Sequence, residues 1–196
     1  MQPTLNQAQQ DELLKYNIPL MLDNFSLASL LAELLISYRT ANFPPPSATV
    51  FLRGNGPPAD IPGENCGFFV TPVIQMAILD CRRSLEFFGL TCDDKTNRLR
   101  PIASRRYADD LGMENFGLSQ VKPEDFLRTT APAMTGQVES MLVEVHKFSN
   151  KQLAHFTFLQ NQVMLPSIRD VSPVMIEAFN HFLFDALDVT SLFRAT

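Results

Sequence analysis

The chain of 196 residues is 45% hydrophobic, which is enough for a single domain, residues 1–196, with a core of its own. Its formal net charge of −5 excludes the broad basic surface that non-specific binding to nucleic acid or to an anionic membrane requires. With no basic start before an apolar run at the N-terminus, and no stretch of roughly 18 consecutive apolar residues, we expect a cytoplasmic protein without a membrane span.

The first part of the chain predicts a short helix, a long helix and a proline-rich segment. Residues 5–17 form at most a short helix, because Pro19 stops it. Asn24 or Ser26 can cap the next helix, which ends before Phe43. Its expected core face is Leu27, Leu30, Leu31, Leu34, Leu35 and Tyr38.

Residues 44–66 contain six prolines and three glycines, which disfavour both a helix and a central strand. We expect a long irregular loop that wraps over the core, with residues 50–52 as a brief extended piece. A binding loop is the alternative.

A second strong helix is predicted over residues 71–88, with Thr71 as its N-cap, Pro72 in its first turn and Gly89 at its end. Its apolar stripe is wider than one neighbouring helix would cover, so the helix is central or also faces a partner subunit. Helical ion pairs account for the charges on its polar face, which are Asp80, Arg82, Arg83 and Glu86.

In the second half of the chain, the sequence predicts short helical turns followed by three helical segments. Residues 90–131 are irregular, with a turn at residues 93–97 and one short helix opened by Pro123. Residues 138–163 predict a helix, a break at residues 148–151 and a second helix. Ser172 and Pro173 start the last helix. The expected fold class is therefore all-α, an antiparallel bundle of four to six helices with the 44–66 loop and no sizeable sheet.

Five basic residues lie within twelve positions without an intervening acid, and these are Lys95, Arg98, Arg100, Arg105 and Arg106. In an acidic protein this local excess can hold a phosphate, an RNA segment or an acidic partner. The alternative is an exposed loop whose cations pair with the aspartates just outside it, at positions 93, 94, 109 and 110.

The phrase Ser149-Asn150-Lys151-Gln152-Leu153-Ala154-His155 resembles the Arg-Asn-Lys-x-x-Ala-His type of motif in HEPN-like helical proteins, many of which are RNases of toxin–antitoxin and defence systems. The helix predicted over residues 71–88, with Cys-Arg-Arg-Ser-Leu-Glu-Phe-Phe at residues 81–88, also looks like an early helix of such bundles, and the resemblance spans about residues 70–190. It implies that His155, Lys151 and Asn150 are the candidate catalytic residues. Ser149 stands where the nuclease members have Arg, and a hydroxyl offers neither the charge nor the fork that holds a scissile phosphate.

The resemblance therefore implies a HEPN-like binding or regulatory protein without RNase activity. Two alternatives stay open: a weak metal-independent RNase that uses His155, and a helical bundle that binds a small apolar ligand. For His155 itself, a histidine whose ring bonds a core carbonyl or carboxylate is the other interpretation.

We expect no cofactor and no metal site, because the three cysteines, Cys66, Cys81 and Cys92, lack a C-x-x-C pair and the histidines lack metal-ligand spacing. The odd cysteine number also favours reduced thiols over a disulfide framework. The expected partners are a second copy of the chain, bound through the helices at 71–88 or 173–188, and RNA or an acidic partner.

Overall fold

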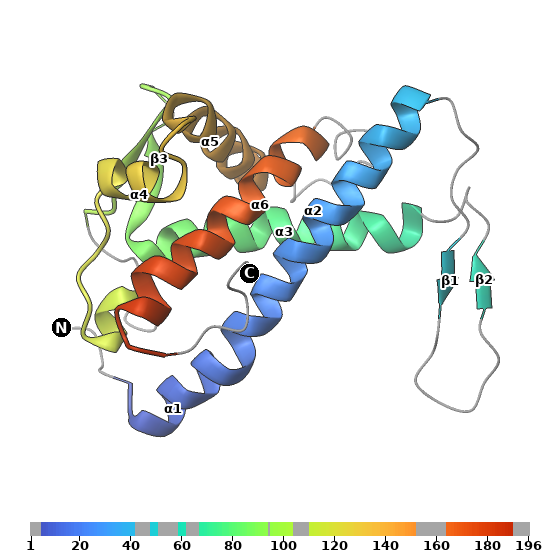
Figure 1. Ribbon diagram of the computed structural model, residues 1–196. Helices are drawn as coiled ribbons and strands as arrows, with labels where there is room; N and C mark the ends of the chain where they lie inside the picture. Colours follow the sequence, from blue (N-terminus) through green and yellow to red (C-terminus); the bar gives the residue numbers. More distant parts are fainter. Residues whose placement is uncertain are drawn as a thin grey trace.

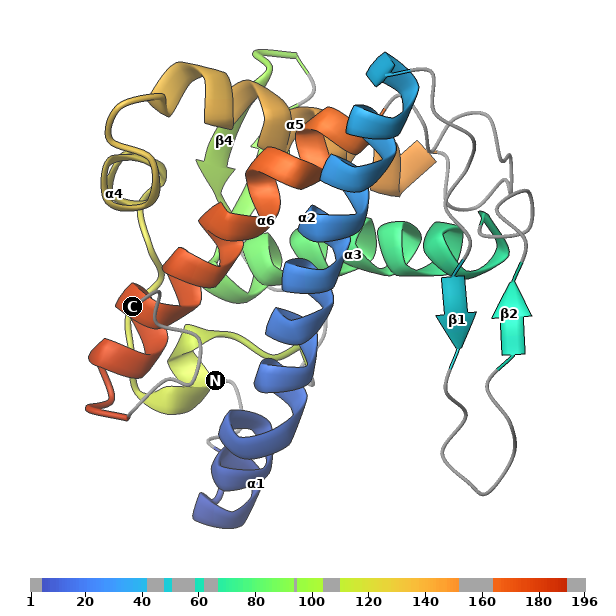
Figure 2. The same ribbon diagram turned by 45° about the vertical axis from the view of Figure 1, so that its right-hand side comes forward.

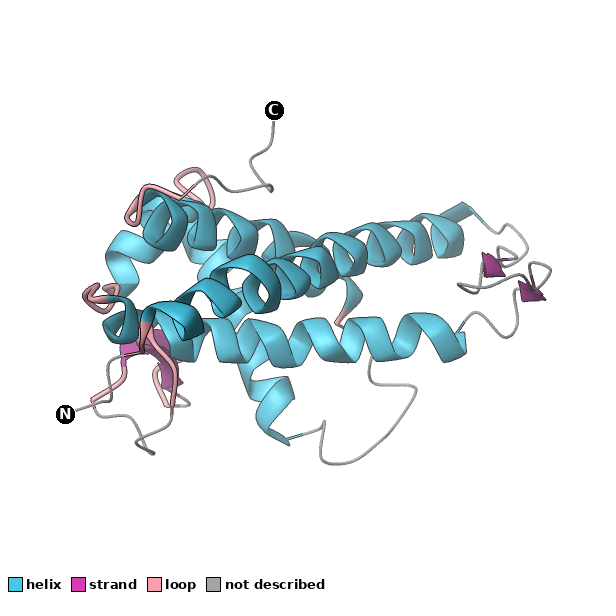
Figure 3. Cartoon of the chain, turned by 90° about the horizontal axis from the view of Figure 1, so that it is seen from below, coloured by secondary structure: helices cyan, strands magenta, loops and turns pink. Residues whose placement is uncertain are grey.

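The computed structural model describes residues 5–41, 48–50, 59–61, 67–93, 95–103, 110–151 and 164–189, and it confirms the all-α class (Figure 1). Four long helices form the body, and the two short hairpins lie at its opposite ends (Figure 3). In chain order the elements are α1 (Gln7–Glu12), the π-turn η1 (Leu13–Asn17), α2 (Ile18–Ala41), β1 (Ala48–Val50), β2 (Ala59–Ile61), α3 (Gly67–Phe88), β3 (Leu90–Asp93), β4 (Arg98–Pro101), the 3-10 turn η3 (Met113–Phe116), α4 (Pro123–Thr130), α5 (Thr135–Lys151), α6 (Leu165–Phe179) and the π-turn η4 (Asn180–Asp185).

The N-terminal helical run passes through Pro19, so the prediction that this proline ends a short helix is wrong. A capping box starts the run, in which the Asn6 side chain accepts from the backbone N–H of Gln9 at 3.0 Å. At η1 the Ile18 N–H bonds the carbonyl of Leu13, five residues back, so the hydrogen-bond register has already shifted when the chain reaches Pro19. The helix then continues to Ala41.

The run from Gln7 to Ser37 is long and apolar enough to cross a membrane by length and composition. Apolar helices in protein cores and N-terminal signal sequences meet the same criterion. Here one side of the helix is packed into the protein, against α3 and α6.

The predicted core face of α2 is wrong in large part. Leu27, Leu30 and Leu34 are exposed, whereas the buried side chains lie on the opposite face and are Ile18, Leu22, Phe25, Ala28 and Ala32. Because α2 is apolar around most of its circumference, periodicity could not decide which face turns inward. The packing of α6 and α3 decides it.

α2 and α6 run in opposite directions and pack along each other, with α3 crossing behind them (Figures 1 and 2). α3 contacts α2, α5 and α6, which cover most of its wide apolar stripe and leave Met76 47% exposed. A partner subunit is therefore not needed to explain the stripe, and dimerisation through residues 71–88 stays a prediction. The same holds for the last helix, because the described part of α6 exposes no large hydrophobic side chain.

The centre of the core is aromatic and joins the end of α3 to α4 and α6. Phe88 is fully buried, and its ring centroid lies 4.8 Å from that of Phe179 and 5.7 Å from that of Phe126. Tilted ring pairs at these distances contribute beyond the apolar area that they bury.

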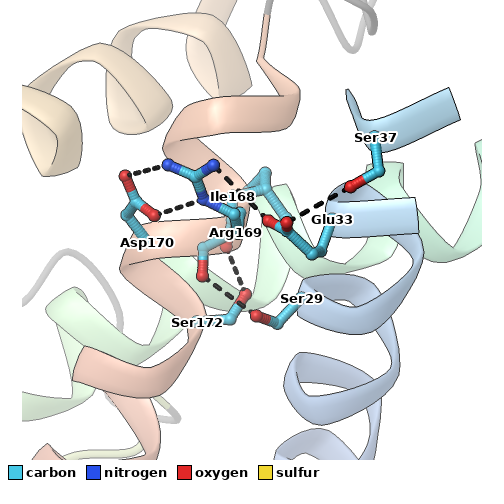
Figure 4. A network of polar contacts seen from close by, with 7 residues as sticks. All are labelled: Ser29, Glu33, Ser37, Ile168, Arg169, Asp170 and Ser172. Carbon is cyan, nitrogen blue, oxygen red and sulfur yellow. Dashed lines mark hydrogen bonds and ion pairs between the residues drawn. The ribbon is translucent and has the colours of Figure 1, made fainter. Parts of the chain in front are cut away.

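The last helix begins at Leu165, about two turns before the predicted start at Ser172 and Pro173. Pro173 has no N–H for the carbonyl of Arg169, and the Ser29 hydroxyl of α2 donates to that carbonyl at 3.0 Å instead (Figure 4). The Ser172 hydroxyl likewise donates to the carbonyl of Ile168 at 2.7 Å. The proline is therefore accommodated inside α6 because the Ser29 hydroxyl of α2 satisfies the carbonyl that lacks its helical donor.

The first half of α3 and the proline-rich segment also differ from prediction. α3 begins at Gly67, a turn before the predicted N-cap at Thr71, with Pro72 inside it. Within the segment predicted to be irregular, β1 pairs antiparallel with β2, in the register Ala48↔Ile61 and Val50↔Ala59. Residues 42–47, 51–58 and 62–66 lie outside the described chain.

A second hairpin stands where short helical turns were predicted. β3 pairs antiparallel with β4, in the register Leu90↔Pro101 and Asp93↔Arg98, and the turn between them has Asn97 at a φ of 60°. The position of the turn was predicted correctly, and the strands were missed. Such a short pair needs support from elsewhere. The buried Glu139 of α5 supplies it, since its carboxylate accepts the Leu99 N–H at 3.0 Å.

Candidate functional site

A cleft of about 890 Å³ opens between the N-terminal helical run, the second half of α3 and the β3–β4 hairpin. Its size is in the range of pockets that hold small molecules. The apolar side chains that line it are Leu13, Ile18, Met21, Phe87 and Phe179. The ionisable ones are Asp80, Arg82, Arg83, Glu86, Arg100 and Asp110.

The chain builds this cleft from its N-terminal helical run and, much later in the sequence, from α3 and the hairpin that directly follows it. The π-turn and Pro19 carry the N-terminal run past α3, which places Ile18 and Met21 opposite Phe87. The hairpin register then places Arg100 and Thr91 side by side at the cleft, since these two residues pair. We call the apolar side chains that line the cleft the floor, and we call Arg82, Arg83 and Arg100 the rim.

Asp80 is the buried charge of the site. Its side chain accepts from Asn24 Nδ2 at 3.0 Å, and Arg83 Nη1 lies 3.6 Å from its other oxygen. Burial raises the pKa of Asp80, opposed by the hydrogen bond from Asn24 and by the Arg83 charge. A buried carboxylate with a raised pKa in a cleft is a functional-site feature.

A pH dependence of stability follows from Asp80. Because its pKa is higher in the folded state, the folded protein binds this proton more tightly, and stability falls as pH rises from the unfolded value of 3.8 through the folded pKa. We expect Asp80→Asn, which keeps an acceptor for Asn24, to remove that decline. Urea unfolding of both proteins at pH 4 and pH 7 gives the free energy of unfolding at each pH. Relative to the natural protein, the variant should be more stable at pH 7 than at pH 4. An equal difference at both pH values would contradict the assignment.

The other ion pairs at the cleft confirm the prediction that helical pairing accounts for the charges of α3. Arg82 Nε lies 2.9 Å from Glu86 Oε1, one turn away, and Arg83 pairs with Asp80. The sequence reading missed that these same residues line a cleft. No spacing rule could have found this, because the opposite wall comes from residues more than sixty positions earlier.

The residues of the predicted basic patch that the structure describes, Lys95, Arg98 and Arg100, lie on the β3–β4 hairpin in different surroundings. Lys95 lies exposed in the turn, and Arg98 Nη1 pairs with Glu139 at 3.1 Å. Arg100 is exposed at the rim of the cleft, where no ion pair joins it to another described residue. Arg105 and Arg106 lie outside the described residues.

The motif that carries the HEPN-like resemblance is only partly described. The predicted break at residues 148–151 is wrong as far as Lys151, because α5 is helical through that residue. Ser149 is buried, and its hydroxyl donates to the carbonyl of His146 at 2.7 Å. Asn150 is exposed, with Nδ2 3.3 Å from His146 Nδ1. His155 and the Lys151 side chain lie outside the described residues.

A second hollow of about 720 Å³ lies between the α4–α5 turn and α6. Its walls are mostly apolar, with Met134, Val138 and Val174 among them. Three charged side chains line it, of which Arg169 and Asp170 bond each other at 2.6 Å and the third is Glu177. This hollow offers less polar recognition than the cleft.

Within the described ranges, no group of three or more His, Cys, Asp and Glu side chains is arranged to hold a metal ion. Cys81 and Cys92 are buried free thiols, and burial raises the pKa of Cys81 well above its ordinary value. Neither cysteine is therefore suited to nucleophilic chemistry.

Comparisons of the chain with models of known families, with curated proteins and with solved structures found no match.

Proposed function

We propose that this protein binds a small amphipathic molecule, one with an apolar body and an anionic group such as a carboxylate or a phosphate. The observation that carries the proposal is the cleft, whose apolar floor is bordered by three arginines. This is the small-ligand alternative of the sequence analysis, with an anionic group added. The role is that of a binding protein.

The sign of the ligand charge follows from which groups at the cleft already have partners. Asp80 is bonded to Asn24 and Arg83, and Glu86 to Arg82. A guanidinium has five N–H donors, and each of these arginines uses one contact in its pair. Donors therefore remain on Arg82 and Arg83, and the charges of Asp80 and Glu86 are each balanced by a neighbouring arginine.

Arg100 adds the strongest reason for an anion. Its side chain is exposed at the rim, and the Arg100 charge is the smallest of several influences that lower the pKa of Asp93, the residue with which Arg98 pairs across the hairpin. A guanidinium in this position can offer a planar pair of donors to a carboxylate or phosphate. The floor beneath it accepts the apolar body.

The RNase and RNA-binding hypotheses stay predictions. Ser149, which stands at the place of the catalytic Arg of the resemblance, is buried against its own helix. An Arg at this position would have to bury its charge, so Ser149→Arg is expected to destabilise the fold before it can restore a phosphate site.

Calorimetric titration with ten-carbon ligands tests the proposal. Decanoate should bind, and decanol and decylamine should bind at least about tenfold more weakly, since a hydrogen bond to a charged group contributes about 1.5–3 kcal/mol. Binding should also strengthen about fourfold for each methylene from hexanoate to decanoate, as burial of a CH₂ contributes about 0.8 kcal/mol.

Arg100→Gln should weaken decanoate binding about tenfold and leave decanol binding unchanged. Arg128→Gln is the matched control, because Arg128 is an exposed arginine on α4, paired with Asp125, that does not line the cleft. Tighter binding of decylamine than of decanoate, or equal losses in the two variants, would contradict the proposal.

A further inference from the structure

α2 has a second apolar face that points away from the core. Four leucines lie on it, and the exposed fractions are 70% for Leu20, 46% for Leu27, 57% for Leu30 and 50% for Leu34. Isolated exposed leucines are common on soluble proteins, but a contiguous row along one helix is not. α2 lies across the front of the molecule in Figure 2, with this part of the helix uncovered by the other described elements.

The spacing of the row is that of a helix-pairing seam. Leu20, Leu27 and Leu34 repeat every seven residues, and Leu30 stands at the intermediate position. An α-helix drifts only about 20° for each heptad, so the row stays on one face over these two heptads. The 24 residues of α2 make a face about 36 Å long.

The size of this face suits a pair of identical surfaces. From the exposed fractions, the four leucines leave roughly 400 Å² of apolar surface in water on each chain, which is about the size of the largest and often functional patch of a monomer. Two such faces bury roughly 800 Å², so the residues that flank the row must supply the rest of the roughly 1,200 Å² at which specific complexes begin.

The charges along α2 argue against a lipid surface as the occupant. The single basic residue of α2 is Arg39 near its C-terminal end, whereas an interfacial helix has Lys and Arg along its polar face to reach lipid headgroups. α2 also contains Asp23 and Glu33, which are costly within a bilayer. The inner face is also held in the protein through the Asn24–Asp80 and Ser29–Arg169 hydrogen bonds.

We propose that the outer face of α2 binds the same face of a second copy of this chain, with the two helices antiparallel. Asp23 falls in the seam, between Leu20 and Leu27. A parallel pair would bring the two Asp23 carboxylates together, whereas an antiparallel pair separates them and gives the self-complementary contact of a two-fold dimer. The proposed dimer therefore forms through α2 and not through the helices at residues 71–88 or 173–188, which the sequence had suggested.

Sedimentation velocity at tens of micromolar tests the pairing. The natural chain should sediment as a dimer of twice 22.0 kDa. The double variant Leu27→Glu, Leu30→Glu should be a monomer with an unchanged circular dichroism spectrum, because the replaced side chains are exposed in the single chain. The milder pair Leu27→Ala, Leu30→Ala should weaken association at least tenfold.

Met134→Glu is the control, since Met134 is similarly exposed, at 52%, but lies between α4 and α5. It should remain dimeric. A natural chain that is monomeric, or a dimer that survives Leu27→Glu, Leu30→Glu, would overturn the proposal. So would co-sedimentation of the natural chain with phosphatidylcholine vesicles that this double variant abolishes.

Asp23→Asn tests the orientation. In an antiparallel pair the dissociation constant should stay within about threefold of the natural value. Tightening by tenfold or more would show that the two carboxylates repel across a parallel seam, and it would overturn the antiparallel arrangement.

Discussion

Gly89→Ala is expected to reduce the free energy of unfolding by about 3 kcal/mol, because the position combines strain with a clash. Its φ is 82°, a region that L residues occupy at a cost, and a Cβ there would lie 2.6 Å from Cγ of Gln120. Gln120 cannot easily retreat, since the next residue, Val121, donates to the Phe88 carbonyl at 2.9 Å. Differential scanning calorimetry should show a melting temperature lower by roughly 6–12 °C.

Two other glycines separate the strain from the clash. Gly117 has a φ of 75° with nothing within 4 Å of an added Cβ, so Gly117→Ala should carry only the strain, about 1–2 kcal/mol. Gly136 lies in the first turn of α5 without that φ and is also open, so Gly136→Ala should stabilise by about 0.5–1 kcal/mol. A cost at Gly89 no larger than at Gly117 would show that Gln120 yields.

Glu139→Ala is expected to cost about 2–3 kcal/mol, because it removes the side chain that anchors the β3–β4 hairpin to α5. The carboxylate is buried and accepts the Leu99 N–H at 3.0 Å, and without it a buried donor is left unpaired. Arg98, the other partner, is 71% exposed and can return to water. Urea unfolding should show the loss, and amide exchange should show reduced protection of the Leu99 N–H.

Conservative changes at the same contact define the cause. Glu139→Gln keeps an oxygen for Leu99 and should cost less than about 1 kcal/mol, and Arg98→Gln should cost less than about 0.5 kcal/mol. If Arg98→Gln costs as much as Glu139→Ala, the ion pair and not the backbone bond carries the stability.

The all-α class and several element boundaries could be predicted from residues that are close together in the sequence. The end of α3 before Gly89, the start of α4 at Pro123 and the turn at residues 93–97 were predicted correctly, whereas the predicted N-cap of α3, Thr71, lies inside the helix. These features depend on neighbours in the chain, which the sequence displays directly.

The predictions of helix boundaries and of the buried face of α2 were wrong where contacts with distant parts of the chain decide the structure. Pro19 and Pro173 lie inside helices because a π-turn shifts the register in one case and the Ser29 hydroxyl takes over a carbonyl in the other. A proline therefore marked a helix boundary in neither place. The buried face of α2 was misassigned because both of its faces are apolar, and only the packing of α3 and α6 distinguishes them.

The candidate site was the least predictable part. The local excess of basic charge made Arg100 a candidate for an anion or RNA patch, and the structure places Arg100 in the lining of the cleft. Its companions Arg82, Arg83 and Asp80 were explained as helical ion pairs, which they also are. A cleft between three segments has no local signature, and neither does the burial of Asp80.

The central claim is that the cleft beneath Arg100 is the ligand site, and amide chemical-shift changes on titration with decanoate test it most directly. The account predicts that the largest changes fall on residues of the cleft, such as Ser84, Thr91 and Leu111. Changes concentrated instead at Met134 and Val174, in the second hollow, or along the outer face of α2 would contradict it.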